Sequence, residues 1–177
     1  MILPETKVPN LELPLINDTK WNLADQSPKN FTLLVFYRGL HCPVCKKQLE
    51  ELAGKLDKFT ERGTNVIAIS ADSEKRAKKA GEEWNVPSLP IGYNLSFDKA
   101  KEFGLHMSKG VSDKEPDYFT EPGIFLLRPD GTLYFSSIQT MPFARPQFDD
   151  ILNAIDFIMK NDYPARGELK EVQKETA

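Results

Sequence analysis

The stretch LLVFYRGLHCPVCKKQLEEL, residues 33–52, decides how this chain folds. Its opening residues form a nearly continuous apolar and aromatic run, which is typical of a β-strand buried on both faces of a sheet. After Cys42 the apolar residues recur at three- and four-residue steps, through Cys45, Leu49 and Leu52, with charged residues between them. That spacing predicts an amphipathic helix. We therefore expect a buried strand that leads through a short loop into a helix, with both cysteines at the junction.

The segments that follow alternate between strand and helix. An apolar run at 66–69 and a charged helical segment at 73–84 come next, and strand–helix–strand units imply parallel pairing. Turn residues at 128–131 predict an antiparallel hairpin before a last helix at 147–159. A second hairpin is expected at the N-terminus, around turn residues 17–20. The sequence thus predicts an α/β protein with a mixed central sheet, helices on both faces and an N-terminal β-hairpin extension.

Two expectations concern less regular regions. The helix that follows the cysteines should run to about Gly63, where glycine ends the periodic pattern. Residues 106–121 show no periodicity and read as a long polar loop, a feature that is often functional in compact domains. Tyr118 and Phe119 lie in this segment, where they either form a lid over the site or pack on the body of the domain.

Composition and charge restrict the class of protein. The chain has 177 residues and a formal net charge of −3, so we expect one domain, 1–160, and a charged C-terminal tail, 161–177. The tail is either frayed or docked on a partner subunit. The charge argues against a nucleic-acid partner or an anionic membrane, and no stretch approaches the roughly 18 apolar residues that span a bilayer. With no secretory pattern at the start, we expect a cytoplasmic protein.

The two cysteines are the only ones in the chain, which excludes a disulfide-stapled scaffold. Pro43 suits the first helical position and makes Cys42 the N-cap residue. Free backbone N–H groups and the helix dipole would then stabilise a Cys42 thiolate, and Arg38 and a protonated His41 would add positive charge. Cys45 shares the buried face of the helix and should be less exposed than Cys42. This arrangement favours thiol–disulfide redox chemistry.

Two other interpretations of the pair stay open. The cysteines could be ordinary buried residues, or they could form half of a metal site. Zinc needs more ligands, and the only histidines are His41, next to Cys42, and His106. A site of Cys42, Cys45 and His106 would suit copper or an open zinc site. The non-enzymatic alternative is therefore a metal-binding or redox-sensor protein. The primary expectation is a protein without metal or organic cofactor.

Four segments in order resemble those of one family. They are VPNLELPLINDTKWNLAD (8–25), the stretch 33–52, LPIGYNLSFDKAKEFGL (89–105) and EPGIFLLRPDGTLYF (121–135). They are similar to the alkyl hydroperoxide reductase and thiol-specific antioxidant (AhpC/TSA) family, the peroxiredoxin-like branch of the thioredoxin-fold superfamily. The resemblance covers roughly residues 5–160. It implies a thioredoxin-like fold and an antioxidant enzyme that reduces hydroperoxides. The sequence leaves the oligomeric state open, with a homodimer as one option.

This chain departs from the family at two positions. Typical members have a threonine three residues before the peroxide-attacking cysteine, and here Cys42 occupies the threonine position while Cys45 occupies that of the cysteine. Typical members also have an arginine just before the strand at 124–127, where this chain has Pro122. That proline matches the cis-proline of thioredoxins. A thioredoxin-like protein disulfide reductase is therefore the alternative activity.

The resemblance and the capping argument favour different sulfurs. Capping and exposure favour Cys42 as the nucleophile with Cys45 resolving, and this is the order we expect, whereas alignment favours Cys45. The attacked hydroperoxide would leave a sulfenic acid, which condenses to a Cys42–Cys45 disulfide that a thioredoxin-like or small-thiol donor reduces. Arg38 either replaces the missing arginine or forms a structural ion pair, and Arg145 is a second arginine that could approach. Four residues should support the site: Tyr37, His41, Pro43 and Pro122.

Overall fold

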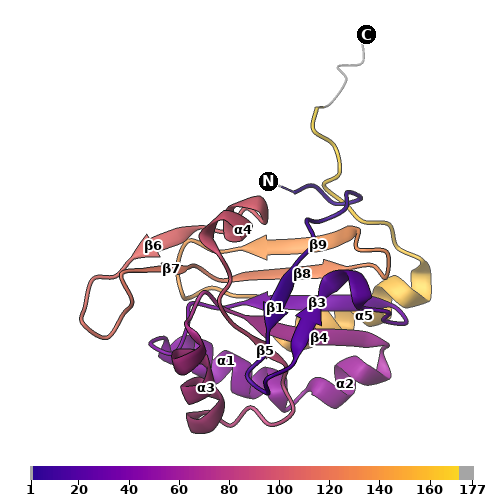
Figure 1. Ribbon diagram of the computed structural model, residues 1–177. Helices are drawn as coiled ribbons and strands as arrows, with labels where there is room; N and C mark the ends of the chain where they lie inside the picture. Colours follow the sequence, from indigo (N-terminus) through magenta and orange to yellow (C-terminus); the bar gives the residue numbers. More distant parts are fainter. Residues whose placement is uncertain (1, 172–177) are drawn as a thin grey trace.

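The computed structural model describes residues 2–171, and a five-stranded mixed sheet lies at its centre (Figure 1). The strand order is β5-β4-β3-β8-β9. β3 pairs in parallel with β4 and antiparallel with β8. The strands are β3 (Phe31–Phe36), β4 (Thr64–Ile69), β5 (Ile91–Gly92), β8 (Gly123–Leu127) and β9 (Leu133–Ile138). The predicted parallel unit and the closing antiparallel hairpin are therefore both confirmed.

Helices cover both faces of the sheet because alternate residues of the central strand point in opposite directions. Leu33 and Val35 of β3 belong to a core with residues of α1, α2 and α5, whereas Leu34 and Phe36 belong to a second core with residues of α4. The helices are α1 (Pro43–Ala53), α2 (Leu56–Glu61), α3 (Glu74–Glu83), α4 (Phe97–Glu102) and α5 (Phe148–Asn161), with a 3-10 turn η1 (Leu23–Asp25). The predicted α/β architecture is confirmed.

The N-terminal hairpin covers part of the second face. Its strands, β1 (Glu12–Pro14) and β2 (Lys20–Asn22), pair antiparallel as a separate two-stranded sheet. Leu13 and Trp21 face each other across this pair and are buried in the same core as Leu34 and Phe36. The predicted β-hairpin extension is therefore confirmed, and its apolar side chains close the face that the longer helices leave open.

Two predictions about less regular regions are wrong. The helix after the cysteines ends at Gly54, whose N–H donates to the carbonyl of Glu50, and α2 begins separately, because glycine is a poor helix former and a frequent end point. Residues 106–121 contain a hairpin of β6 (Met107–Lys109) and β7 (Tyr118–Thr120), which projects from the body (Figure 1). The hairpin escapes sequence patterns because its strands are short and β6 has no buried residue.

The first residues of the predicted tail pack on the domain. After α5, the hydroxyl of Tyr134 donates to the carbonyl oxygen of Tyr163 over 2.8 Å, and Ala165 is buried in the core beside α5. The division into 1–160 and 161–177 stays a prediction, and residues 172–177 lie outside the described part of the chain. Residues 163–165 therefore pack against the body of the domain.

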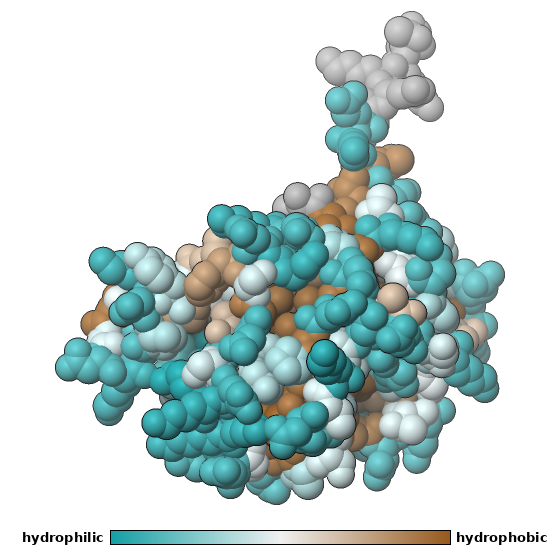
Figure 2. Space-filling model, viewed as in Figure 1, coloured by the Kyte–Doolittle hydropathy of each residue, from teal (hydrophilic) through white to brown (hydrophobic). Residues whose placement is uncertain are grey.

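The surface is mostly hydrophilic on the face seen in Figure 2, with smaller apolar patches between the polar residues. Within residues 2–171, no helix has both the length and the apolar character needed to span a bilayer.

Candidate active site

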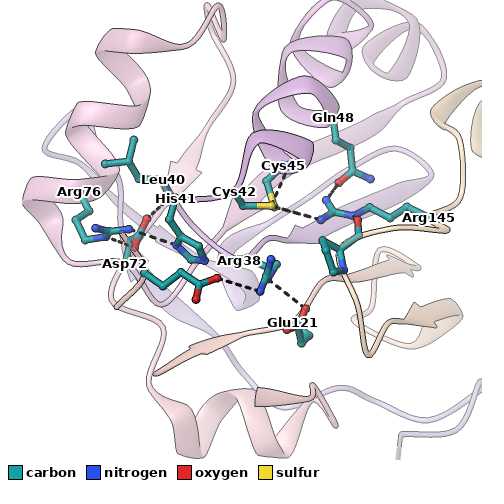
Figure 3. Close-up of a disulfide and its surroundings, with 12 residues drawn as sticks. Arg38, Leu40, His41, Cys42, Cys45, Gln48, Asp72, Arg76, Glu121 and Arg145 are labelled. Carbon is teal, nitrogen blue, oxygen red and sulfur yellow. Dashed lines mark hydrogen bonds and ion pairs between the residues drawn. A yellow bond between two sulfur atoms is a disulfide. The ribbon is translucent and has the colours of Figure 1, made fainter. Parts of the chain in front are cut away.

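The two cysteines lie where β3 leads into α1, at the N-terminus of that helix. Cys42 is the N-cap residue and Pro43 is the first helical residue, as the sequence predicted. The backbone N–H of Cys45 donates to Cys42 Sγ over 3.2 Å. The two sulfurs are joined as a disulfide (Figure 3). The site therefore combines a redox-active pair with the positive end of a helix.

Cys45 is buried as expected, but the expected exposure of Cys42 is wrong. Cys42 is 1% exposed and Cys45 is 0% exposed, so both are buried. Part of the cover comes from Arg145, a residue 100 positions after Cys45, on the loop between β9 and α5. Cys42 therefore differs from Cys45 in that its sulfur caps the helix, and not in its exposure.

Arg145 contacts both sulfurs. Its Nη2 lies 3.2 Å from Cys45 Sγ and 3.9 Å from Cys42 Sγ. The other guanidinium nitrogens also form hydrogen bonds. Nη1 donates to the side-chain oxygen of Gln48 (Figure 3), and Nε donates to the carbonyl of Pro142 over 2.7 Å. Burial lowers the pKa of Arg145 to about 10, with the positive charge of Arg38 acting in the same direction, so the side chain stays protonated at pH 7.

Arg38 is held by carboxylates. Its guanidinium lies 3.6 Å from Glu115 and 3.4 Å from Glu121, and it also lies 4.4 Å from the centre of the Phe119 ring. Glu121 is buried and accepts a 2.6 Å hydrogen bond from the hydroxyl of Ser108. Within residues 2–171, Arg38 makes no hydrogen bond to either sulfur. The structural ion pair considered for Arg38 is thus present, and its catalytic role stays a prediction.

Asp72, which follows β4, fixes the loop before Cys42. One carboxylate oxygen accepts the backbone N–H of Leu40 over 2.7 Å, and the other accepts from Nε of Arg76 over 2.8 Å. Gly39 has φ +129°, and a Cβ there would lie 2.7 Å from the carboxylate oxygens of Asp72. Only glycine fits this turn. The sequence analysis missed Asp72, and the signal was an acidic residue three positions after the end of a buried strand.

His41 completes this side of the site. Its Nδ1 lies 3.3 Å from a guanidinium nitrogen of Arg76, and its ring lies 4.6 Å from that of Phe119. Because a guanidinium only donates, Nδ1 accepts and Nε2 carries the proton. Burial lowers the pKa of His41, and the charge of Arg38 lowers it further, so the ring is neutral at pH 7. The predicted positive charge on His41 is therefore wrong.

The positions of Phe119 and Tyr118 decide whether these side chains form a lid over the site or pack on the body of the domain. Phe119 is buried against His41 and Arg38, whereas Tyr118 is exposed beside Phe97. Of the two alternatives, packing on the body is therefore the one seen for Phe119.

Tyr37 and Pro122 lie where the central strands end. Tyr37 is fully buried, with its ring 6.0 Å from that of Trp84, and burial raises the pKa of its hydroxyl, which stays protonated. Pro122 precedes β8, at the position that matches the cis-proline of thioredoxins, but its peptide bond is trans, since residues 2–171 contain no cis peptide bond. Beside it, the Glu121 N–H donates to the carbonyl of His106 over 2.8 Å.

A metal site receives no support from the side chains. Among residues 2–171, no group of three or more histidine, cysteine, aspartate or glutamate side chains is arranged to hold a metal ion. His106 is exposed, at the start of the β6–β7 hairpin. The described residues therefore offer the cysteine pair no third ligand of these types.

A buried cysteine pair at the start of the helix after the central strand of a mixed sheet defines a thioredoxin-like thiol oxidoreductase. Residues 4–136 match the AhpC/TSA family. The chain belongs to this family, and it is a thiol-dependent peroxidase by class.

Individual relatives agree with this membership. 1-Cys peroxiredoxin A of Oryza sativa is 24% identical over 155 residues, covering 84% of this chain and 69% of the relative. Alkyl hydroperoxide reductase C of Staphylococcus saprophyticus is 26% identical over 129 residues, covering 72% and 66%. This chain thus spans about two thirds of the length of each relative. The structure of peroxiredoxin 6 of Arenicola marina superposes with a TM-score of 0.76 at 21% identity, covering 100% of this chain and 86% of that one, which confirms the thioredoxin-like fold.

Proposed function

We propose that this peroxidase reduces hydroperoxides by cycling Cys42 and Cys45 between a dithiol and an intramolecular disulfide. The observation that carries the proposal is the Cys42–Cys45 disulfide at the N-terminus of α1. The two cysteines lie about one helical turn apart, and Cys42 Sγ accepts a hydrogen bond from the backbone N–H of Cys45. A bridge that closes so short a loop constrains the unfolded chain weakly, so stabilisation of the fold is a poor reason for it. Redox chemistry is the better reason.

The proposed cycle has three steps. The Cys42 thiolate attacks the outer oxygen of a hydroperoxide, the O–O bond breaks, and the alcohol leaves after taking up a proton. The product is a sulfenic acid on Cys42. The Cys45 thiolate then attacks that sulfur, which forms the disulfide and releases hydroxide, protonated to water. Finally, a donor dithiol reduces the disulfide and is itself oxidised.

Other residues act on this pair without contacting the sulfurs. Arg38 contributes positive charge, although Glu115 and Glu121 offset much of it. Four further residues have supporting roles: Tyr37, His41, Pro43 and Pro122. Pro43 begins the helix, and the other three hold the loop and the strand ends around it. These roles are proposals, and single substitutions with peroxide turnover as the readout test them.

The donor, compartment and assembly are also part of the proposal. We propose a thioredoxin-like protein or a small thiol as the electron donor, in the cytoplasm, where reducing thiols keep such a pair largely open between turnovers. A homodimer is compatible with the fold, since β9 is an edge strand of the central sheet. Light scattering on the purified protein measures its mass in solution and decides between monomer and dimer.

The experiment that tests the function compares wild type with Cys42→Ser and Cys45→Ser. We expect both variants to lose multiple turnover of hydrogen peroxide with dithiothreitol as donor. Cys45→Ser should keep one equivalent of sulfenic acid, which a dimedone-type probe and mass spectrometry detect on Cys42. The exposed substitution Arg166→Gln is the matched control and should keep wild-type turnover.

Three outcomes would contradict this assignment. A sulfenic acid trapped on Cys45 in Cys42→Ser, with none on Cys42 in the other variant, would reverse the order of the sulfurs. A wild-type protein that reduces insulin disulfides but consumes no peroxide would replace the peroxidase with the disulfide reductase. A stoichiometric bound metal in the purified protein would favour the metal-binding alternative.

A further inference from the structure

We infer that the cleft between α1 and the loop 139–147 binds a small thiol that carries a carboxylate, and that this molecule is the electron donor for the Cys42–Cys45 disulfide. The inference rests on the proposed function, because it names the chemical class of the donor for the last step of that cycle. The loop 139–147 connects β9 with α5.

The cleft lies beside the disulfide. Its volume is about 250 Å³, with residues of α1 on one side and residues of the loop 139–147 on the other. At about 30 Å³ for each water molecule, the cleft has room for about eight waters, which is the size of a small organic molecule. Arg145 lines the cleft and also lies 3.2 Å from Cys45 Sγ. A molecule in the cleft therefore lies next to a side chain that contacts the disulfide.

The charge of the cleft is positive. Lys47 lines it, and among residues 2–171 no carboxylate lies within 4.0 Å of the Lys47 ammonium group. Arg145 donates only to neutral acceptors and to the sulfurs. The acidic residue of the lining is Glu51, and the ammonium group of Lys55 lies 2.8 Å from its carboxylate. Two cations without an anionic partner and one paired anion favour a negatively charged ligand.

The other lining residues suit a short organic chain. Gln48 brings a side-chain amide to the cleft, and Val44, Pro142 and Phe143 bring apolar surface. The Phe143 ring is exposed. A ligand with a carboxylate at one end and a few methylene groups can therefore pair with the cations and pack on the apolar wall.

The burial of the disulfide favours a small donor. Cys42 is 1% exposed and Cys45 is 0% exposed, so neither sulfur is available at the surface. A protein donor must bring a cysteine on its own folded surface into contact with one of these sulfurs. A small thiol in the cleft needs only the space that the Arg145 side chain now fills. The donor that the burial of both sulfurs suits best is therefore a small molecule.

The oxidation state of the structure assigns the cleft to the donor. A hydroperoxide with a carboxylate shares the chemistry that the cleft recognises, but a hydroperoxide reacts with the dithiol, whereas the donor reacts with the disulfide. The structure holds the Cys42–Cys45 disulfide, and the cleft is formed in that state. The cleft is thus present at the step in which the donor binds.

The reductive step balances with two donor molecules. The first donor thiolate attacks Cys42 Sγ, the Cys42–Cys45 bond breaks, and Cys45 leaves as a thiolate that takes up a proton. The second donor thiolate attacks the donor sulfur of this mixed disulfide and releases the Cys42 thiolate. Two donor thiols are oxidised to one disulfide, and the protein disulfide is reduced to two thiols. The cleft raises the concentration of the donor beside the bond that breaks.

The test compares three monothiols that are similar in size and differ in charge. They are 3-mercaptopropionate, 2-mercaptoethanol and cysteamine, which are anionic, neutral and cationic. Reduction of the disulfide is followed by quenching and mass spectrometry, and each rate constant is expressed per thiolate, since the thiolate attacks. We expect Lys47→Glu to lower the ratio of the anionic to the neutral rate by about three- to tenfold and to raise the ratio of the cationic to the neutral rate.

Salt and a neighbouring lysine provide the controls. At about 1 M salt the Debye length is about 3 Å, so the effect of Lys47→Glu should shrink. Lys46→Glu makes the same change in net charge one position away. Lys46 pairs with Glu50 at 3.9 Å and is not among the residues that line the cleft, so this variant should keep the wild-type ratios. Far-UV circular dichroism confirms that each variant is folded.

Three outcomes would overturn the inference. The first is an unchanged ratio of rates in Lys47→Glu, and the second is an equal change in Lys46→Glu, which would make the effect one of overall charge. The third is a reduced thioredoxin that reduces the disulfide far faster than 3-mercaptopropionate and equally fast in Lys47→Glu. None of these measurements uses a peroxide. A wild-type protein without peroxidase activity would therefore refute the proposed function, while the rates would still decide which donor the cleft binds.

Discussion

The surroundings of the two arginines near the disulfide differ in one respect that matters for chemistry. Arg38 lies between Glu115 and Glu121, so its charge is offset within the protein. Arg145 is anchored by an amide and a backbone carbonyl, both neutral, and directs its remaining nitrogen at the sulfurs. The same type of side chain therefore serves two purposes. An arginine with carboxylate partners holds the structure together, whereas one with neutral partners keeps its charge available for an anion.

The largest effect should follow from removing the buried partner of Arg38. Glu121→Gln removes one of the two carboxylates that balance the charge of Arg38 and leaves Glu115 as its only ion-pair partner. Removing one member of a buried ion pair destabilises proteins by about 3 kcal/mol. We expect a loss of this order in the free energy of unfolding, measured by urea denaturation. Glu115→Gln is the matched change at the more exposed partner and should cost less than about 1 kcal/mol. Equal losses in the two variants would contradict the central role of Glu121.

A smaller effect should follow from giving Arg145 the partner that it lacks. Gln48→Glu replaces a neutral acceptor of its Nη1 with a carboxylate and makes its surroundings resemble those of Arg38. We expect reduction of the disulfide by dithiothreitol to slow by about three- to tenfold, because nearby negative charge disfavours a thiolate. Gln48→Met has a similar size and no charge, so it should slow the reaction less. A rate in Gln48→Glu at or above that of wild type would refute the comparison.

The smallest effect concerns His41, whose neutral state depends partly on Arg38. Its pKa is lowered in the folded protein, so between that value and the ordinary value of about 6.5 the unfolded chain binds more protons. The stabilising contribution of neutral His41 is therefore present above about pH 6.5 and is lost as the pH falls through the folded pKa. We expect His41→Gln to flatten the fall in unfolding free energy between pH 7 and 5. The matched control is His106→Gln, a substitution of the exposed histidine.

Much of the fold could be predicted from local pattern. The run at 33–36 is apolar on both sides of the strand, and Pro43 after Cys42 is sufficient to predict where α1 begins. Both hairpins that flank this unit follow from turn residues and short apolar runs. These features depend on neighbours within a few positions, and such short-range signals are what periodicity reports. The break at Gly54 was missed because a glycine inside a periodic pattern is compatible with either a continued or an ended helix.

The parts of the site that could not be predicted depend on distant contacts. The sequence offered Arg145 only as an arginine that could approach the site. Its direct contact with the sulfurs, from 100 positions along the chain, depends on its hydrogen bond to Gln48, which no local pattern predicts. The burial of both sulfurs was missed for the same reason, since part of their cover belongs to that later loop. Asp72 and Glu121 looked like ordinary acidic residues. Their role emerges only when the sheet brings the ends of β3, β4 and β8 together.

The packing of the segment after α5 has a practical consequence for anyone who prepares this protein. Tyr134 bonds to the backbone at Tyr163, and Ala165 fills a place in the main core, so a version shortened at residue 160 would uncover apolar surface beside β9 and α5. Such surface promotes association and precipitation. Shortened versions should therefore end no earlier than Arg166, and an affinity tag belongs beyond that point, where it leaves the packed segment undisturbed.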